Sequence, residues 1–141
     1  MDIRVAAYAV VVDEGGHILL AHWNEGRRAA WTLPGGGLEP GEDPERAARR
    51  EVKEETGYKV EIQELLGIHS RVIPVSRRIS EDATEPLHAL RIVYRARITG
   101  GKLRNEIDGS TDRAEWFPLD AVEELQRVKL VDIAIGMAGH G

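Results

Sequence analysis

Cysteine is absent from this chain of 141 residues, which excludes disulfide bonds and thiol chemistry and is compatible with a reducing cytosol. Long apolar segments are absent as well. No stretch reaches about 18 apolar residues, and no basic region near the start leads into a long apolar run. We therefore expect neither a membrane-spanning helix nor a secretory signal, and these absences together predict a cytoplasmic protein.

Basic residues are fewer than acidic ones: the chain has 19 Lys and Arg residues and 24 Asp and Glu residues, which give a formal net charge of -5. Binding along a nucleic-acid backbone depends on a basic surface, so this balance argues against a nucleic-acid partner. An acidic protein can still bind a phosphorylated small molecule through a divalent cation. The length and the 42% hydrophobic content predict one domain over residues 1–141.

Alternating strands and helices are expected along the chain. Residues 3–12 and 17–23 read as two strands of a hairpin that turns at Gly15-Gly16. Residues 59–72 predict one or two strands with a bulge or bend at Gly67, and residues 87–98 give the clearest strand pattern. With a terminal helix at residues 128–137, this order predicts an α/β fold in which a mixed sheet lies between helices.

A short acidic helix is expected over Pro44–Thr56. Asp43 is a good N-cap, and Pro44 suits the first helical position because its missing N–H would be unpaired there. Gly57 follows where a left-handed residue ends helices most easily. Ala48 and Val52 lie one turn apart and are expected to pack on a sheet, which leaves the acidic residues at the edge of a cleft.

Three carboxylates share one strip of this helix, because Glu51 is separated from Glu54 and Glu55 by three and four positions. Like charges at this spacing cost roughly 0.2–0.5 kcal/mol per pair in an isolated helix. We therefore expect a cation on the strip. The residues before the helix are rich in glycine and proline, which predicts a tight loop whose backbone a ligand or metal can approach closely.

The spacing around this helix resembles the Nudix box of the Nudix hydrolases. Its pattern runs Gly36, five residues, Glu42, seven residues, Arg50, Glu51, Val52, any residue, Glu54, Glu55, any residue, Gly57. All seven invariant positions of the box are filled. The one departure is Tyr58, where the family usually has Ile, Leu or Val, and a bulky apolar ring can serve the same packing role.

The resemblance implies an α/β/α sandwich with a mixed sheet and a metal-dependent attack of water on a phosphorus of a diphosphate. It implies that Glu51, Glu54 and Glu55 hold Mg²⁺ or Mn²⁺, with the Gly36 carbonyl as a further ligand. Both are hard cations that prefer oxygen donors. The resemblance also implies that Arg50 orients a glutamate through a charge-assisted hydrogen bond. The five His lack a ligand spacing, so no zinc site is predicted.

The general base is open at this point. In the family it is sometimes a glutamate of the box and sometimes an acidic residue of a later loop. The candidates are Glu51, Asp108, Asp112 and Glu115, and the sequence does not rank them.

Substrate contacts are expected outside the box. Arg71, Arg77 and Arg78 lie on predicted loops or strand ends, where they can hold a phosphate. Four aromatic residues can either stack on a base or pack in the core: Trp23, Trp31, Tyr94 and Trp116. Pro74 stands sixteen residues beyond Tyr58, a placement similar to a marker of the ADP-ribose pyrophosphatases of this family.

The resulting hypothesis is a pyrophosphohydrolase for a nucleoside diphosphate derivative, such as ADP-ribose or a nucleotide sugar. The alternatives are a nucleoside triphosphate pyrophosphohydrolase and a Nudix module that senses a nucleotide without cleaving it. An RNA-end hydrolase is disfavoured by the net charge. The expected partner is a small-molecule nucleotide, and we keep a homodimer as a hypothesis for the oligomeric state.

Overall fold

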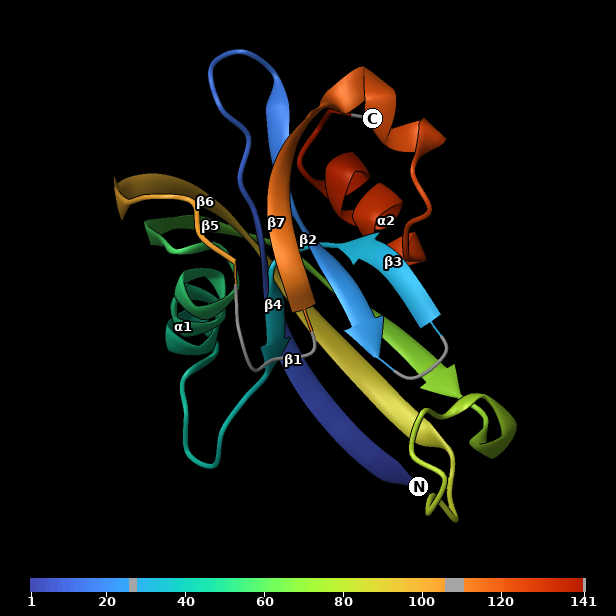
Figure 1. The fold of residues 1–141 in the computed structure, drawn as a ribbon. Helices are drawn as coiled ribbons and strands as arrows, with labels where there is room; N and C mark the ends of the chain where they lie inside the picture. The colour runs from blue at the N-terminus through green and yellow to red at the C-terminus, as the bar shows by residue number, and fades with distance from the viewer. Residues whose placement is uncertain (26–27, 106–110, 141) are drawn as a thin grey trace.

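The computed structural model describes residues 1–25, 28–105 and 111–140, with side chains omitted at positions 25 and 28 (Figure 1). Its elements are β1 (Asp2–Val10), β2 (His17–Glu25), β3 (Arg28–Thr32), β4 (Gly35–Gly37), α1 (Pro44–Thr56), β5 (Tyr58–Ile73), the 3-10 helix η1 (Val75–Arg77), β6 (Leu87–Gly101), β7 (Thr111–Pro118), the 3-10 helix η2 (Leu119–Glu124) and α2 (Lys129–Met137). None of the helices in these ranges is long and apolar enough to cross a bilayer.

The strands form two sheets. The first has the order β4-β1-β6-β5, in which β1 and β6 run parallel while the other two pairs are antiparallel, so the expected mixed sheet is confirmed. The second has the order β3-β2-β7 and is antiparallel. A parallel pair needs a long connection, and the chain between β1 and β6 contains β2 and β3 of the second sheet, β4, α1 and β5.

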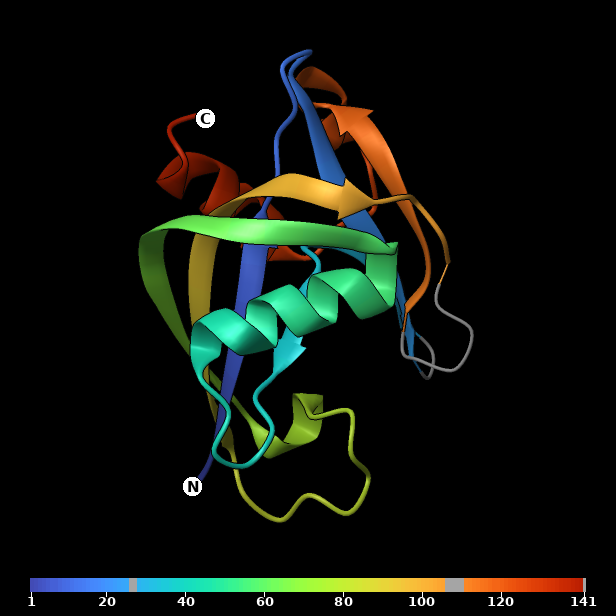
Figure 2. The same ribbon diagram turned by 90° about the vertical axis from the view of Figure 1, so that its left-hand side faces the viewer.

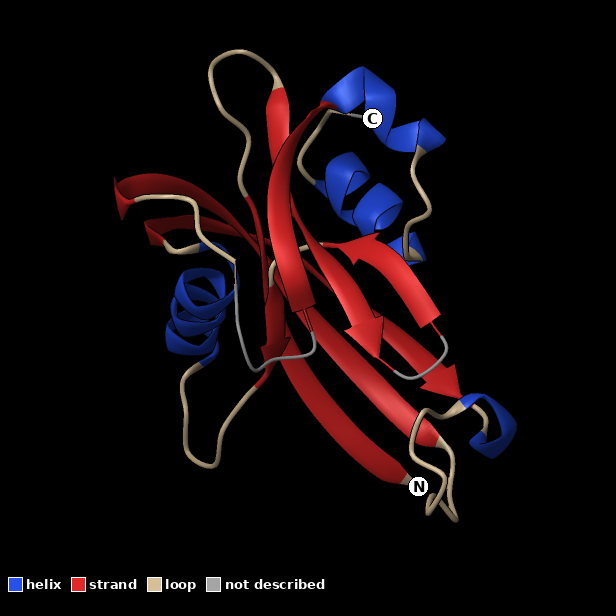
Figure 3. Ribbon diagram, in the orientation of Figure 1, coloured by secondary structure: helices blue, strands red, loops and turns tan. Residues whose placement is uncertain are grey.

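Helices cover both faces of the first sheet, as Figure 3 shows by colour and Figure 2 from the side. On one face, Ala47 and Ala48 of α1 pack with Ala7 and Tyr94. The opposite face shares a core with α2 and the second sheet. This arrangement is the expected α/β/α sandwich.

The predicted hairpin of residues 3–12 and 17–23 is wrong beyond its turn. The two segments pair only next to the turn, through the Val12–Ile18 bridge and the Leu19 N–H donating to the Val11 carbonyl at 3.0 Å. β1 then enters the first sheet and β2 the second. The reason is that β4 and β6 occupy the two edges of β1, which leaves no edge for β2.

The bulge predicted near Gly67 is confirmed. The pairing of β5 with β6 shifts register between Leu65 and Gly67, so β5 bends as one long strand. A Cβ added at Gly67 would lie 3.2 Å from Met137 Cε of α2. Glycine at this position therefore lets the terminal helix pack closely on the bent strand.

The acidic helix is confirmed from its first to its last residue. Asp43 accepts a hydrogen bond from the Glu45 N–H at 2.8 Å, and Gly57 ends the helix with φ at 85°. The side chains of Ala48 and Val52 are fully buried against the sheet. Their burial fixes the rotation of α1 and therefore the direction in which its glutamates point.

Truncation at Val52 should destabilise the protein. Val52→Ala removes two buried methyl groups from a site with no exposed surface, so we expect the free energy of unfolding to fall by about 2–3 kcal/mol in urea denaturation. The matched control is Arg49→Ala on the exposed side of the same helix, where we expect a change within about 0.5 kcal/mol. Equal effects of the two changes would show that α1 does not depend on this contact.

Candidate functional site

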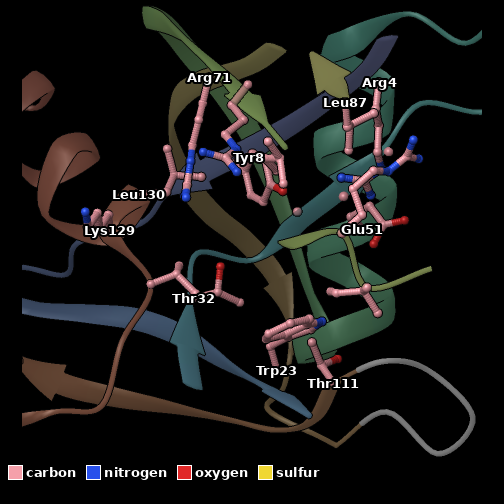
Figure 4. Close-up of a pocket in the computed structure, with 18 of the residues that line it drawn as sticks. Arg4, Tyr8, Trp23, Thr32, Glu51, Arg71, Leu87, Thr111, Lys129 and Leu130 are labelled. Carbon is pink, nitrogen blue, oxygen red and sulfur yellow. The ribbon is translucent and has the colours of Figure 1, made fainter. Parts of the chain in front are cut away.

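A cavity of about 780 Å³ opens between the two sheets beside α1 (Figure 4). Glu51 of α1 lies on one side of the cavity, and Lys129 at the start of α2 lies on the opposite side. Tyr8 of the first sheet faces Trp23 of the second across it. The cavity is therefore bounded by both helices and both sheets, and every wall comes from a different part of the chain.

Two of the three predicted carboxylates line this cavity. Glu55 is 5% exposed and accepts a hydrogen bond at Oε1 from the Gly35 N–H at 2.9 Å. Glu51 lies against the next glycine, because a Cβ added at Gly36 would be 2.8 Å from Glu51 Oε2. The glycines that were expected to lie in a tight loop instead form the short strand β4, because they pair with β1, and this strand runs directly past both carboxylates.

Glu54 does not join them. Its side chain is 52% exposed and is absent from the cavity lining, and its Oε2 lies 3.3 Å from Arg50 Nη1. At about 100° per residue, Glu55 is rotated about 40° from Glu51 toward the sheet, whereas Glu54 is rotated about 60° toward solvent. Within the described ranges no three His, Asp or Glu side chains gather at metal-ligand spacing. The role of all three glutamates as metal ligands stays a prediction.

Arg50 holds the acidic strip together. Its Nε and Nη2 donate to the two carboxylate oxygens of Glu42, both at 2.8 Å, and its Nη1 donates to Glu51 Oε1 at 2.7 Å. Nη2 also reaches the Gly37 carbonyl at 3.2 Å. The guanidinium therefore supplies a cation that the strip requires, and it orients Glu51 as the sequence predicted.

The partner of this guanidinium, Glu42, is nearly buried, with 7% of its side chain exposed. Hydrogen bonds from Arg50 and from the Glu39 N–H lower the pKa of Glu42 to about 2. Glu42 in turn raises the pKa of Arg50 well above its usual range. Glu42 thus anchors the loop before α1, and it does not line the cavity.

The candidates for the general base are separated by the geometry. Asp112 Oδ1 lies 2.9 Å from His22 Nδ1, and the Asn24 amide donates to Oδ2 at 3.2 Å. Burial opposes ionisation of Asp112, but these hydrogen bonds outweigh it and lower its pKa. Asp112 and the exposed Glu115 are both absent from the cavity lining, and Asp108 lies outside the described residues. Of the candidates that can be placed, Glu51 alone lines the cavity.

The predicted arginines differ in their partners. Arg71, Arg77 and Arg78 all line the cavity. Arg78, however, donates to Asp2 Oδ2 at 2.6 Å and to the Glu85 carbonyl at 2.8 Å, so it fastens the loop before β6 to β1. Arg71 and Arg77 have no ion pair within the ranges described.

Two further cavity arginines, Arg4 on β1 and Arg91 on β6, escaped the sequence analysis. Both lie in apolar segments that were predicted as strands. The alternation of side chains along those strands was the signal that could have placed the two arginines on one face. Arg4 and Tyr8 share one face of β1, and Arg91 shares that face on β6.

The four aromatic candidates differ in whether they line the cavity or pack elsewhere. Trp23 lines the cavity, whereas Trp31 and Tyr94 are buried and Trp116 donates its indole N–H to the Tyr58 hydroxyl at 3.2 Å. The Tyr58 ring also packs edge-on against Trp116, so the residue that departs from the box pattern serves as a packing residue.

Thr111, which pairs with Trp23 across β2 and β7, also lines the cavity. Thr111 is 3% exposed, and its Oγ1 has no hydrogen-bond partner within the described part of the chain. A buried hydroxyl without a partner is unfavourable unless a ligand supplies one.

Comparison with known proteins gives one consistent family. The model of the NUDIX domain matches residues 2–134. The chain is 34% identical over 143 residues to a "MutT-like protein" of Streptomyces ambofaciens, covering 96% of this chain and 80% of that protein. It is 31% identical over 121 residues to an "ADP-ribose pyrophosphatase" of Methanocaldococcus jannaschii, covering 86% of this chain and 65% of that protein.

The share of a relative that the chain spans varies widely. This chain is 31% identical over 151 residues to the "putative nudix hydrolase 1" of Caenorhabditis elegans, and the match covers 99% of this chain but 38% of that protein. Among solved structures, a NUDIX hydrolase from Nitrosomonas europaea superposes with a TM-score of 0.79 at 26% identity, covering 98% of this chain and 89% of that one. With a completed box, the shared fold and a family match over nearly its whole length, the chain belongs to the NUDIX hydrolase family.

Proposed function

We propose that this protein is a divalent-metal-dependent hydrolase that cleaves the diphosphate linkage of a nucleoside diphosphate derivative, such as ADP-ribose or a nucleotide sugar. The observation that carries the proposal is the pair Glu51 and Glu55, which line one cavity wall beside the glycine strand β4. The relative from Methanocaldococcus jannaschii is named an ADP-ribose pyrophosphatase, which supports this substrate class.

The donor set at this wall suits Mg²⁺ or Mn²⁺, with Glu51, Glu55 and the Gly36 carbonyl as the proposed ligands. All are oxygen donors, and the space beside Glu51 Oε2 is one that a Cβ at Gly36 would fill. Glu54 is half-exposed beside Arg50 and adds negative charge to the acidic strip. A cation held there would lower the pKa of the attacking water and neutralise charge on the phosphoryl oxygens.

The protein groups then have separate tasks. Arg50 occupies Glu51 Oε1, so Oε2 is the oxygen left to face a cation and the reacting atoms. The Gly35 N–H fixes Oε1 of Glu55 in the same way. Because both carboxylates are held before substrate arrives, little reorganisation is needed during the reaction.

The nucleoside end of the substrate is proposed to lie toward the second sheet. Trp23 offers a ring for stacking, and Thr111 in the same wall has a buried Oγ1 with no hydrogen-bond partner among the described residues. Pro74 precedes the 3-10 helix that delivers Arg77 to the cavity, and its carbonyl accepts from the Arg77 N–H at 2.9 Å. Pro74 therefore has a structural role at the start of this 3-10 helix, in addition to its position at the substrate marker.

Loss of either cavity carboxylate should abolish turnover. With ADP-ribose and Mg²⁺ or Mn²⁺, we expect Glu51→Gln and Glu55→Gln each to lower kcat by about 10²–10⁴, measured as mononucleotide release by chromatography. Glu124→Gln, at an exposed residue that is absent from the cavity lining, is the control. Full turnover by Glu55→Gln would remove the assigned chemistry, and saturable binding without any product by the unaltered protein would indicate a nucleotide-sensing module.

Glu42 should act on the reaction through Arg50. Glu42→Gln weakens the anchor of the guanidinium, so we expect kcat to fall about 10-fold with KM nearly unchanged. An unchanged kcat would show that the position of Glu51 does not depend on this anchor.

The same variant has a pH signature. Because the pKa of Glu42 is lowered from 4.5 to about 2, its ion pair stabilises the fold above pH 4.5 and this contribution is lost as the pH falls toward 2. The unaltered protein should therefore lose more unfolding free energy than Glu42→Gln between pH 6 and about pH 3 in urea titrations. Parallel curves would contradict the lowered pKa.

A further inference from the structure

We propose that Arg4, Arg71 and Arg91 form a phosphate-binding subsite on the first-sheet wall of the cavity, for a phosphoryl group additional to the diphosphate linkage that is cleaved. The inference rests on the proposed function and narrows its substrate class to nucleotides with a further phosphoryl group.

The register of the first sheet brings the three arginines together. Arg4 on β1 and Arg71 on β5 both pair with Ala89 of β6, one from each side. Arg91 stands two residues farther along β6, about 7 Å from Ala89 and on the same face. Ala89 between Arg4 and Arg71 is small, and all three arginines line the cavity. The Arg4 guanidinium lies toward β4, where a Cβ at Gly37 would be 3.2 Å from its Nη2. Figure 4 shows Arg4 and Arg71 on the same side of the cavity, across from Trp23 and Thr111.

No carboxylate compensates these charges within the described ranges. None of the three arginines has an ion pair there, and the acidic residues among the lining residues are Glu51 and Glu55. Other partly buried arginines do have such partners: Arg50 pairs with Glu42, Arg95 with Glu64 and, within the cavity lining itself, Arg78 with Asp2. The partly buried Arg71 and Arg91 differ from these in having no such acid within the described residues.

The environment of Arg91 disfavours its positive charge. Burial lowers the pKa of Arg91, and the charges of Arg71 and Arg4 lower it further against an opposing effect of Tyr8. Its Nη1 lies 3.5 Å from His69 Nδ1. Burial, followed by Arg91 and Arg71, also lowers the pKa of His69, so the imidazole remains neutral and can accept this hydrogen bond. Arg71 and Arg91 are partly buried, whereas Arg4 is exposed. A partly buried arginine among like charges is stabilised by an anion from outside the protein.

A phosphoryl group is the anion that fits. It carries up to two charges and three oxygens, which match the forked donors of several guanidinium groups. The position also differs from that of the cleaved linkage. Along β4, Gly36 faces Glu51, whereas Gly37 faces the opposite side, where a Cβ would lie 3.2 Å from Arg4 Nη2. A diphosphate at Glu51 and Glu55 therefore leaves the arginine wall for another group of the same substrate.

Two sources supply such a group, a phosphomonoester on a nucleoside diphosphate derivative and the terminal phosphate of a nucleoside triphosphate. The experiment compares kcat/KM within two substrate pairs, ADP-ribose with 2′-phospho-ADP-ribose and dGDP with dGTP. We expect the unaltered protein to prefer the member with the added phosphate by about 10-fold in at least one pair, which identifies the source.

Arg71→Gln and Arg4→Gln should each reduce that preference about 10-fold. Arg97→Gln is the matched control, because Arg97 is an exposed strand arginine that pairs with Glu61 and is absent from the cavity lining. Equal losses on both members of a pair would show that the arginines bind the cleaved linkage itself and would overturn the proposal. Absence of any preference in the unaltered protein would do the same.

Binding without metal separates this proposal from the proposed hydrolysis. In EDTA, we expect inorganic phosphate at millimolar concentration to raise the Tm of the unaltered protein and of Glu55→Gln, but not that of Arg4→Gln/Arg71→Gln. Circular dichroism checks that each variant is folded. If no nucleotide is hydrolysed but this pattern appears, the subsite stands and the assigned reaction fails. If phosphate raises the Tm of all variants equally, the subsite is refuted.

Discussion

The guanidinium of Arg50 is the contact on which the arrangement of the site depends. It binds both oxygens of Glu42 in the loop before α1, one oxygen of Glu51 on the helix and the Gly37 carbonyl of β4. Three segments that approach the cavity from different directions are thus joined by one planar group. A lysine could not make these contacts together, because its ammonium lacks the forked geometry.

The cavity is divided by charge. Glu51 and Glu55 supply negative charge at the α1 wall, and the arginines of β1, β5 and β6 supply positive charge at the sheet wall. The first wall requires a cation and the second an anion, so a phosphorylated substrate with a divalent metal satisfies both at once. This division also explains how an acidic protein can bind a polyanion, because the net charge of the surface does not describe the cavity.

Local signals in the sequence were sufficient for α1, for the long strands β5 and β6 and for the box, but not for the short strand β4. The N-cap Asp43 and the left-handed Gly57 placed α1 correctly because helix ends depend on nearby residues. The bulge at Gly67 was also predictable, because a glycine within a strand is itself a local signal for a bulge. The pairing of β1 and β2 was not, since which edge a strand uses depends on competing strands far away in the chain, here β4 and β6.

The sequence by itself determined the family, the acidic helix and the oxygen-donor chemistry, because these depend on residue types at fixed short spacings. The tertiary structure decided which groups meet. It turned Glu54 toward solvent, paired Asp112 with His22 and Arg78 with Asp2, and placed Arg4 beside the cavity. Such outcomes depend on strand register and on the rotation of a helix against a sheet, which are set by packing across the whole domain.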